Sequence, residues 1–350
     1  TLSSGEQQKI RLLAIANTQL TGITYILDEP YAGLDITEAM RIKELLLELT
    51  RRGNTVVLVD HSPKGLTSAY RIVELGPDAG EKGGAIVFDG KPEELAANRS
   101  TATGLVFSGR GYYSNNLNIN TQQDKIAIQN LNGDEITIPS GCFTAITGPT
   151  GSGKTNLLVN VIGESVSSQK AINCQMIALP HAMKVVNVKE VVGGSSPYST
   201  IGTQLGIANY LRKQLSLTPE AKALRLKPGY FGPHSSGGRC EVCAGTGSVR
   251  IALDPMPDYQ EQCESCNGTG FNAEALFFLW EELNISQWLQ LSVEDAWKKL
   301  SHDSVAKKML ETALELDLGY LKLGQPFSTL SSGEQQRLHL ASIVQESRDK

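Results

Sequence analysis

A glycine-rich run that ends in a lysine and a threonine gives the clearest indication of chemistry. Residues 148–155 read GPTGSGKT and fit the pattern G-x-x-x-x-G-K-[ST], between an apolar run and a run with helical periodicity. Glycines let backbone N–H groups turn toward phosphate oxygens, and a helix start adds partial positive charge. A chance glycine turn is the alternative, but the flanking runs favour nucleotide binding. The expected phosphate contacts are Gly148, Gly151, Ser152, Gly153, Lys154 and Thr155, with Thr155 also binding Mg²⁺.

Four of the six cysteines form two C-x-x-C pairs with 19 residues between them. This spacing is typical of tetrahedral Zn²⁺ bound by thiolates, because two close pairs can converge on one ion. Each pair continues as C-x-x-C-x-G-x-G, and the glycines allow tight turns that aim N–H groups at sulfur. A redox pair is the alternative, and a catalytic zinc would need an open position. The sequence predicts a structural zinc module over residues 239–271, with the ligands Cys240, Cys243, Cys263 and Cys266.

Two carboxylates and a histidine follow apolar runs near the start of the sequence. Asp28 and Glu29 end the run 23–27, and His61 follows the run 55–59. At the carboxyl end of a parallel strand, Asp28 suits Mg²⁺ coordination and Glu29 suits polarisation of the attacking water. A solvated strand end and a structural histidine are the alternative interpretations.

The octapeptide TLSSGEQQ occurs twice, at residues 1–8 and 329–336. Its Ser and Glu have the spacing of a capping box before an amphipathic helix. A capped helix start is also an anion site, so the repeat can offer a helix N-terminus to a terminal phosphate. The residues predicted to do so are Ser3, Gly5, Ser331 and Gly333.

The elements that must position these residues alternate between strands and helices. Short apolar runs typical of strands occur at 23–27, 55–59, 72–75 and 85–88, and a stretch with helical periodicity lies between the first two, at 38–50. Strands that alternate with helices predict a parallel α/β sheet. A further strand is expected at 142–147. We predict a first domain part over 1–98, a polar linker over 99–124 and a second domain part over 125–350. Residues 164–230 give no clear pattern.

The composition sets limits on partners and compartment. The chain has 350 residues, a net charge of −5 and no apolar run of the roughly 18 residues that span a membrane. Any contact with nucleic acid must therefore be local, and the cations nearest the cysteines are Arg225, Lys227, Arg239 and Arg250. Paired cysteines beside a phosphate loop indicate a cytoplasmic protein that binds metal.

The order of these motifs resembles that of ABC ATPases. LSSGE, which resembles that family's signature motif, is followed by ILDEP, by GLD and by a histidine after the next strand. The copies of this motif at residues 1–8 and 329–336 are called the first and second signature. The resemblance implies that Asp28 and Glu29 are a Walker B pair, Asp35 a D-loop residue and His61 the switch histidine. It makes Lys154 and Thr155 the Walker A of a second domain, so the expected fold is α/β with tandem P-loop nucleotide-binding domains.

The resemblance narrows to the UvrA family at the zinc-like segment. RCEVCAGTG, the 19-residue spacing and the run LGYLKLGQP at 318–326 are similar to that family. Membership implies an ATPase that recognises damaged double-stranded DNA in nucleotide excision repair, with ATP, Mg²⁺ and Zn²⁺, homodimerisation and a UvrB-like partner. The family's order also implies that the first Walker A, the UvrB-binding region and the second Walker B lie outside this sequence.

Departures from the family pattern keep alternatives open. Ser4 and Ser332 replace a usual glycine, Asp35 stands where the family has His, and Gly193 and Gly194 replace the Asp-Gln of its Q-loop. These departures indicate a divergent paralogue, for example a drug-tolerance ATPase without a repair role. A zinc scaffold of the DnaJ chaperone type is a third hypothesis, but such proteins carry four C-x-x-C repeats and no phosphate loop.

Overall fold

The computed structural model describes residues 20–60, 63–77, 79–80, 83–108, 125–140, 142–149, 151–179, 198–253 and 256–348, with Leu12, Ile15 and Ser196. The chain divides into two compact units, Thr1–Asn187 and Val188–Lys350. The predicted domain boundaries stay predictions, and most of the linker predicted over 99–124 lies outside the described residues.

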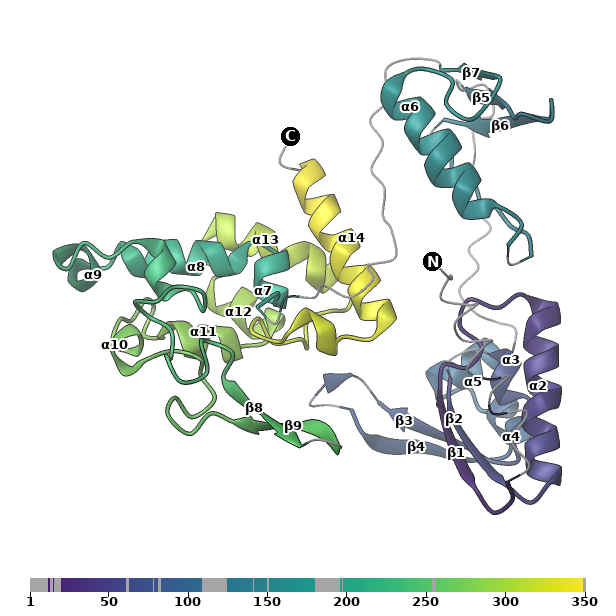
Figure 1. The fold of residues 1–350 in the computed structure, drawn as a ribbon, viewed down its shortest axis with the longest axis horizontal. Coiled ribbons are helices and arrows are strands. Elements are labelled where there is room, and N and C mark those ends of the chain that lie inside the picture. Colours follow the sequence, from purple (N-terminus) through teal and green to yellow (C-terminus); the bar gives the residue numbers. More distant parts are fainter. Residues whose placement is uncertain are drawn as a thin grey trace. The chain divides into compact units, whose positions relative to one another are not determined.

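A β-α-β unit opens the described part of the first unit (Figure 1). Strands β1 (Thr24–Asp28) and β2 (Thr55–Val59) pair in parallel, and α2 (Ile36–Arg51) connects them. Successive side chains of a strand point to opposite faces, so only alternate residues reach α2. The residues on that face are Tyr25, Leu27, Val56 and Leu58.

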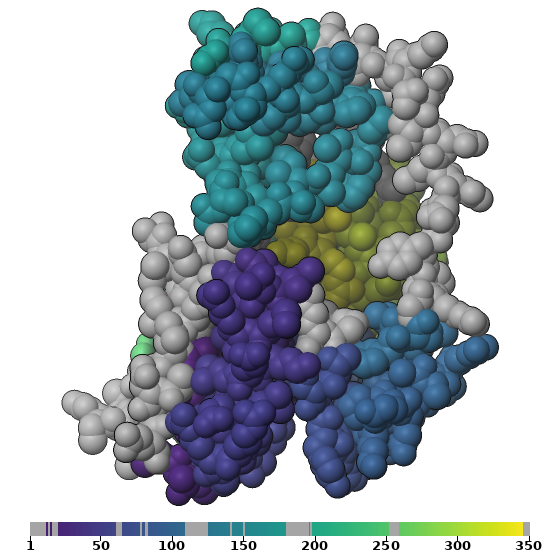
Figure 2. Space-filling view, turned by 90° about the vertical axis from the view of Figure 1, so that its right-hand side faces the viewer, coloured from purple at the N-terminus to yellow at the C-terminus, as the bar shows by residue number. Residues whose placement is uncertain are grey.

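The opposite face of this two-stranded sheet is exposed, which corrects one expectation from the sequence. Ile26 is 76% exposed and Val59 is 60% exposed, so the run 55–59 is not the buried strand that its apolar character predicts. Among the residues that the structure describes, a covering layer is present on one side only, where α2 buries Ile42, Leu46 and Leu49. Figure 2 shows the outer side of α2 in purple.

The next two strands also differ from the expected parallel sheet. Strands β3 (Ile72–Gly76) and β4 (Ala85–Gly90) pair antiparallel, in a sheet separate from β1 and β2. The connection between β3 and β4 is too short to hold the crossover helix that parallel strands need. Three short helices accompany this hairpin: α3 (Pro63–Leu66), α4 (Pro92–Ala97) and α5 (Ala102–Phe107).

A third sheet belongs to residues 125–179. Strands β5 (Lys125–Gln129), β6 (Glu135–Pro139) and β7 (Met176–Ala178) form it in the order β6-β5-β7, and both pairings are antiparallel. A π-helical segment (Asn156–Gly163) runs into α6 (Glu164–Ser168) and buries Val161, Ile162 and Val166. The helix expected directly after the glycine-rich run is therefore confirmed.

The strand predicted over 142–147 is wrong. The described residues 142–149 take part in no strand pairing, and Phe143 is 89% exposed. A strand exists only where a neighbouring strand shares its hydrogen bonds. The described part of this sheet offers no such neighbour to residues 142–149.

The second unit is a helical body with one projecting hairpin (Figure 1). Its core surrounds Trp288, which is fully buried and donates from Nε1 to the carbonyl oxygen of Trp280 at 3.1 Å. The helices of the body are α7 (Ile201–Gln204), α8 (Ile207–Ser216), α9 (Pro219–Ala223), α10 (Ala273–Leu276), α11 (Ile285–Gln290), α12 (Val293–Lys299), α13 (Ser304–Glu315) and α14 (Ser332–Arg348), with 3-10 turns at Pro228–Phe231 and Phe327–Thr329.

The hairpin of the second unit consists of β8 (Ser248–Leu253) and β9 (Met256–Gln262), paired antiparallel. It lies between the two cysteine pairs in sequence, so its base is where those pairs are brought together. Among the helices that the structure describes, none has both the length and the apolar character needed to cross a membrane.

Candidate metal centre and nucleotide-contacting segments

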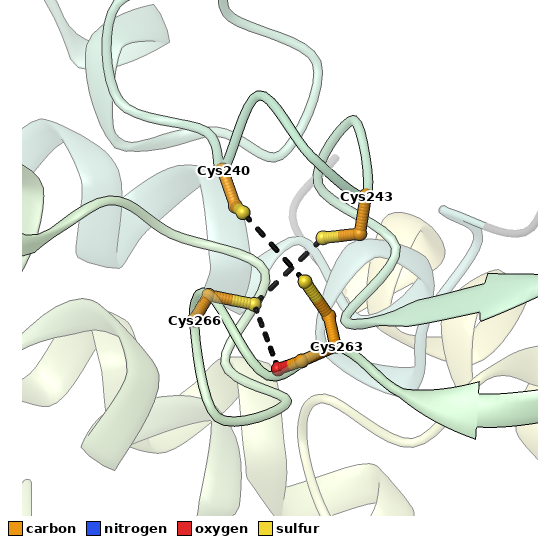
Figure 3. Close-up of side chains that lie close together, drawn as sticks. All are labelled: Cys240, Cys243, Cys263 and Cys266. Atoms are coloured by element: carbon orange, nitrogen blue, oxygen red, sulfur yellow. Dashed lines mark hydrogen bonds between the residues drawn. The ribbon is translucent and has the colours of Figure 1, made fainter.

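Four buried cysteine side chains converge at the base of the β8–β9 hairpin (Figure 3). The Sγ atoms of Cys240 and Cys263 are 3.9 Å apart, and those of Cys243 and Cys266 are 3.7 Å apart. All four sulfur atoms lie within 4.8 Å of one another. Zn–S bonds of about 2.3 Å place the sulfurs of a tetrahedral site about 3.8 Å apart. The donor set and its spacing therefore fit a tetrahedral Zn²⁺ ion.

Each cysteine pair is held by its own turn, and the two turns have the same hydrogen-bond pattern. In the first turn, the N–H of Gly245 donates to the carbonyl oxygen of Cys240 at 3.2 Å, and the N–H of Gly247 points at the Cys243 sulfur at 3.3 Å. In the second, Gly268 and Gly270 make the corresponding bonds to the carbonyl of Cys263 and the sulfur of Cys266, again at 3.2 and 3.3 Å. The N–H groups of Gly247 and Gly270 stabilise negative charge on sulfur, as the sequence predicts.

The two turns, which we call the first and second knuckle, also complete each other. The N–H of Cys240 donates to the carbonyl of Gly270 at 2.9 Å, and the N–H of Cys263 donates to the carbonyl of Gly247 at 3.0 Å. A Cβ at Gly247 would lie 2.5 Å from the carbonyl oxygen of Gly268. Glycine is therefore required at this position both by the positive φ of 75° and by the close approach of the other knuckle.

The protein environment treats the thiols unequally. Burial raises the pKa of the Cys240 thiol, but hydrogen bonds from the backbone N–H groups of Cys243 and Val242 outweigh this effect and lower that pKa to about 6. Burial and the neighbouring thiols raise the pKa of Cys266 to about 11, against the effect of the Gly270 N–H. Close thiols cannot all ionise without a cation between them, so this cluster favours a bound divalent metal.

The glycine-rich run forms the loop that precedes the helix, as predicted. Gly148, Gly151 and Gly153 have φ angles of 151°, 80° and 86°, which non-glycine residues rarely adopt. The ammonium of Lys154 folds over this loop and donates to the carbonyl oxygens of Gly148 at 2.8 Å and Pro149 at 2.6 Å. The lysine therefore lies where a phosphate above the loop would meet it. Ser152 and Thr155 lie in the same turn, at the start of the helix.

The carboxylates of the first unit lie at one end of its parallel sheet. Asp28 is the last residue of β1 and pairs with Val59, and the N–H of Glu29 donates to the Val59 carbonyl at 2.8 Å. Glu29 has a left-handed backbone with φ of 44°, a conformation often associated with functional positions. His61 and the first signature residues, Ser3 and Gly5, lie outside the described residues.

Asp35 caps the helix α2. Its Oδ1 accepts from the N–H of Glu38 at 2.9 Å, and the N–H of Asp35 donates to Glu38 Oε2 at 3.1 Å. This reciprocal pair is a capping box, and it follows from an Asp three residues before a Glu at a helix start. The sequence contains this capping signal in addition to the resemblance that makes Asp35 a D-loop residue.

The second signature begins α14 and forms the predicted capping box. The N–H and Oγ of Ser331 donate to Glu334 Oε2 at 2.7 and 2.8 Å, and the N–H of Glu334 points back at Ser331 Oγ at 3.4 Å. Gly333 has open space where a side chain would project, so a ligand can approach the helix start closely. Ser331 and Gly333 thus lie together at the N-terminus of α14, whose partial positive charge favours an anion.

Tyr320 is a residue of this site that the sequence did not indicate. Its hydroxyl donates to Glu334 Oε1. Burial raises the pKa of Glu334, but the hydrogen bonds from Tyr320 and Ser331 outweigh it and hold that pKa below its usual value. Tyr320 belongs to the family-like run 318–326, but that resemblance gives no information about its partner, so only the fold reveals the contact with Glu334.

Together, a phosphate loop that opens a helix, a parallel strand that ends in Asp-Glu and a capped signature helix define an ABC-type nucleotide-binding fold, here with a four-thiol module. No protein-family model matches the chain. UvrABC system protein A of Methanothermobacter thermautotrophicus is 36% identical over an alignment 361 residues long, which covers 97% of this chain and 37% of that protein. The Micrococcus luteus protein of that name is 36% identical over 99% of this chain and 36% of its own length.

A solved structure supports the same relationship. UvrA2 from Deinococcus radiodurans matches with a TM-score of 0.88 at 32% identity, over 99% of this chain and 43% of that chain. The chain is UvrA-like over nearly its whole length, which confirms both the family resemblance and the ABC-type fold. It spans less than half the length of the curated relatives it matches.

Proposed function

We propose that this chain is part of an ATP-dependent DNA-damage recognition protein of nucleotide excision repair. The observation that carries the proposal is the four-thiol module at Cys240, Cys243, Cys263 and Cys266, set in a chain that also holds a phosphate loop and a signature helix. Relatives named UvrABC system protein A are 36% identical to this chain over nearly its whole length, which supports the proposal.

ATP with Mg²⁺ is the proposed ligand of the phosphate loop. Lys154 would exchange its contacts with the loop carbonyls for the terminal phosphates, and Thr155 would bind Mg²⁺. Ser331 and Gly333 would offer the start of α14 to a terminal phosphate, as Ser3 and Gly5 would in the first signature. In the first domain, Asp28 would ligate Mg²⁺, Glu29 would polarise the attacking water, and His61 and Asp35 would complete the site.

A structural Zn²⁺ ion is the proposed occupant of the cysteine cluster. Bound zinc supplies the positive charge that keeps four clustered thiolates ionised. The chain's own contribution is the mutual support of the two knuckles, which fixes the base of the β8–β9 hairpin. With four sulfur ligands no position is open for a substrate, so the module orients the hairpin rather than performing chemistry.

Damaged double-stranded DNA is the proposed macromolecular ligand. A chain with a net charge of −5 can bind DNA only through local groups that contact phosphates and respond to distorted shape. Arg225 and Lys227 lie between α9 and the knuckles, while Arg239 is engaged with Glu241 at 3.6 Å. By similarity to its relatives, we further propose a homodimer that works with a UvrB-like partner in the cytoplasm.

The experiment uses the longest native protein that contains this chain. Its affinity for duplex DNA with a single bulky lesion is measured against the same duplex without the lesion, with ATP present. Tighter binding to the lesion, lost on Lys154→Ala, is the expected result. Equal affinity for both duplexes would refute damage recognition and leave only a nucleotide-dependent DNA-binding protein.

A role in drug tolerance is the second candidate. Asp35 and the segment containing Gly194 depart from the family pattern, which favours a paralogue with a changed task. Deletion of the gene decides between the two. Loss of drug tolerance with unchanged survival after ultraviolet light would support this candidate, whereas sensitivity to ultraviolet light supports repair.

A further inference from the structure

Tyr198 joins the first knuckle to the segment that enters the helical body. Its hydroxyl donates to the carbonyl oxygen of Ala244 at 3.0 Å, and Ala244 directly follows the ligand Cys243. The ring of Tyr198 meets that of His234 edge-on, with centroids 4.2 Å apart. Tyr198 is half-buried, so its side chain is packed against neighbouring residues and does not extend freely into solvent.

The first knuckle is packed tightly against the same turn. A Cβ at Gly245 would lie 2.1 Å from the carbonyl oxygen of Pro233, the residue before His234. Ala244 itself has a left-handed backbone with φ of 50°. A change in the knuckle backbone therefore moves the acceptor of the Tyr198 hydroxyl, because the surrounding atoms leave little space for compensation.

On its other side, Tyr198 continues into a strand-like segment that pairs with the approach to the second signature. The carbonyl of Ser199 accepts from the N–H of Phe327 at 2.7 Å, and the N–H of Gly202 donates to the carbonyl of Leu323 at 2.7 Å. Thr200 and Pro326 form an antiparallel bridge between these two contacts. The residues after Tyr198 are thus hydrogen-bonded to residues 323–327.

Residues 323–327 lead directly to the start of α14. Phe327 is buried, and its carbonyl accepts from the Leu330 N–H at 3.2 Å and from Gln335 Nε2 at 3.3 Å. Leu330 precedes Ser331, the residue of the capping box. Hydrogen bonds joined by short stretches of backbone therefore link the first knuckle, through Tyr198 and residues 199–202, to the start of the signature helix.

We propose that Tyr198 is a positioning residue that couples the metal-holding first knuckle to the second signature. The proposal rests on the proposed zinc site. When metal fixes the knuckle, Ala244 holds the Tyr198 hydroxyl, and residues 199–202 hold the signature approach in place. Coupling between two sites is reciprocal, so a change at the signature approach also alters how tightly the knuckle retains metal.

The test is hydrogen–deuterium exchange on the full 350-residue chain, with zinc bound and after chelation. We expect chelation to speed exchange of residues 323–331 at least roughly five-fold, the factor that one hydrogen bond supplies, while α13 stays protected. In Tyr198→Phe, which lacks only the hydroxyl, the response of residues 323–331 to chelation should disappear. The matched control is Tyr210→Phe, which removes a tyrosine hydroxyl bonded to Asp303 instead, and should respond as the wild type does.

Zinc affinity gives a second readout, by competition with a chromophoric chelator. Tyr198→Phe should bind zinc up to roughly five-fold more weakly than Tyr210→Phe. Three results would each overturn the coupling. Chelation could leave the exchange of residues 323–331 unchanged, or it could speed the exchange of α13 as much as that of residues 323–331. The third is that residues 323–331 of Tyr198→Phe respond to chelation as fully as those of the wild type. A purified wild-type chain that takes up no zinc would instead refute the metal site, and metal analysis distinguishes that failure from the others.

Discussion

Substitution of Gly247 by alanine tests how strictly the two knuckles depend on each other. The residue has a φ of 75°, and an added Cβ would lie 2.5 Å from the carbonyl oxygen of Gly268 in the other knuckle. The matched control is Gly206→Ala in the same unit. Gly206 has a φ of 78° and open space where a Cβ would project, so it shares the backbone strain without the clash.

The expected cost has two parts. A left-handed backbone costs a non-glycine residue about 1–2 kcal/mol, and this part applies to both variants. Overpacking against a backbone atom adds about 1–3 kcal/mol, and this part applies only to Gly247→Ala. Bound metal fixes the two knuckles against each other, so the overpacking cost should appear as weaker zinc binding. Gly247→Ala should therefore bind zinc about 5–150-fold more weakly than Gly206→Ala.

Chelator competition measures the zinc affinity of both variants, and urea unfolding measures their stability. Gly206→Ala should lose stability while keeping the zinc affinity of the wild type. Equal zinc affinity in the two variants would refute the reasoning, because it would mean that the knuckles can separate at Gly247 without disturbing the metal.

Three further predictions concern the nucleotide segments and the core. Lys154→Ala should weaken ATP binding at least roughly ten-fold, because a charged contact with phosphate is lost; fluorescent-nucleotide titration checks this, with Lys170→Ala unchanged. The folded pKa of Glu334 lies below its ordinary value, so its stabilisation of α14 is complete above that value and is lost as pH falls through the folded pKa. In Glu334→Gln, the free energy of unfolding measured with urea should fall less steeply as pH decreases. A fall as steep as that of the wild type would contradict the assignment. Trp288→Ala, at a fully buried site, should cost about 3–5 kcal/mol by the same measurement.

The sequence predicted most where residue types alone determine geometry. The cysteine spacing and its glycines predicted both knuckles, because sulfur ligands and positive φ angles leave few alternative turns. Ser331 and Glu334 predicted the capped start of α14 for a similar reason, since the capping box is a local hydrogen-bond pattern. The run 148–155 predicted the loop and the helix that follows it.

The sequence predicted less where distant neighbours decide the outcome. Apolar character suggested a strand at 142–147 and a buried strand at 55–59, but pairing and coverage depend on segments that the run itself does not contain. Residues 164–230 gave no pattern because several of their helices are short, such as α7 and α9. Tyr198 and Tyr320 were missed because their partners are distant in sequence.

The four-cysteine module leaves the helical body and returns to it at one place. Arg239 and Phe271 face each other as an antiparallel bridge, and the N–H of Asn272 donates to the carbonyl of Gly238 at 3.0 Å. The module is thus an excursion whose ends already touch. Such an insertion can lengthen, shorten or be exchanged for another during evolution while the helices on either side keep their packing. A graft of a foreign loop between Gly238 and Asn272 would need to span only the width of one strand pair.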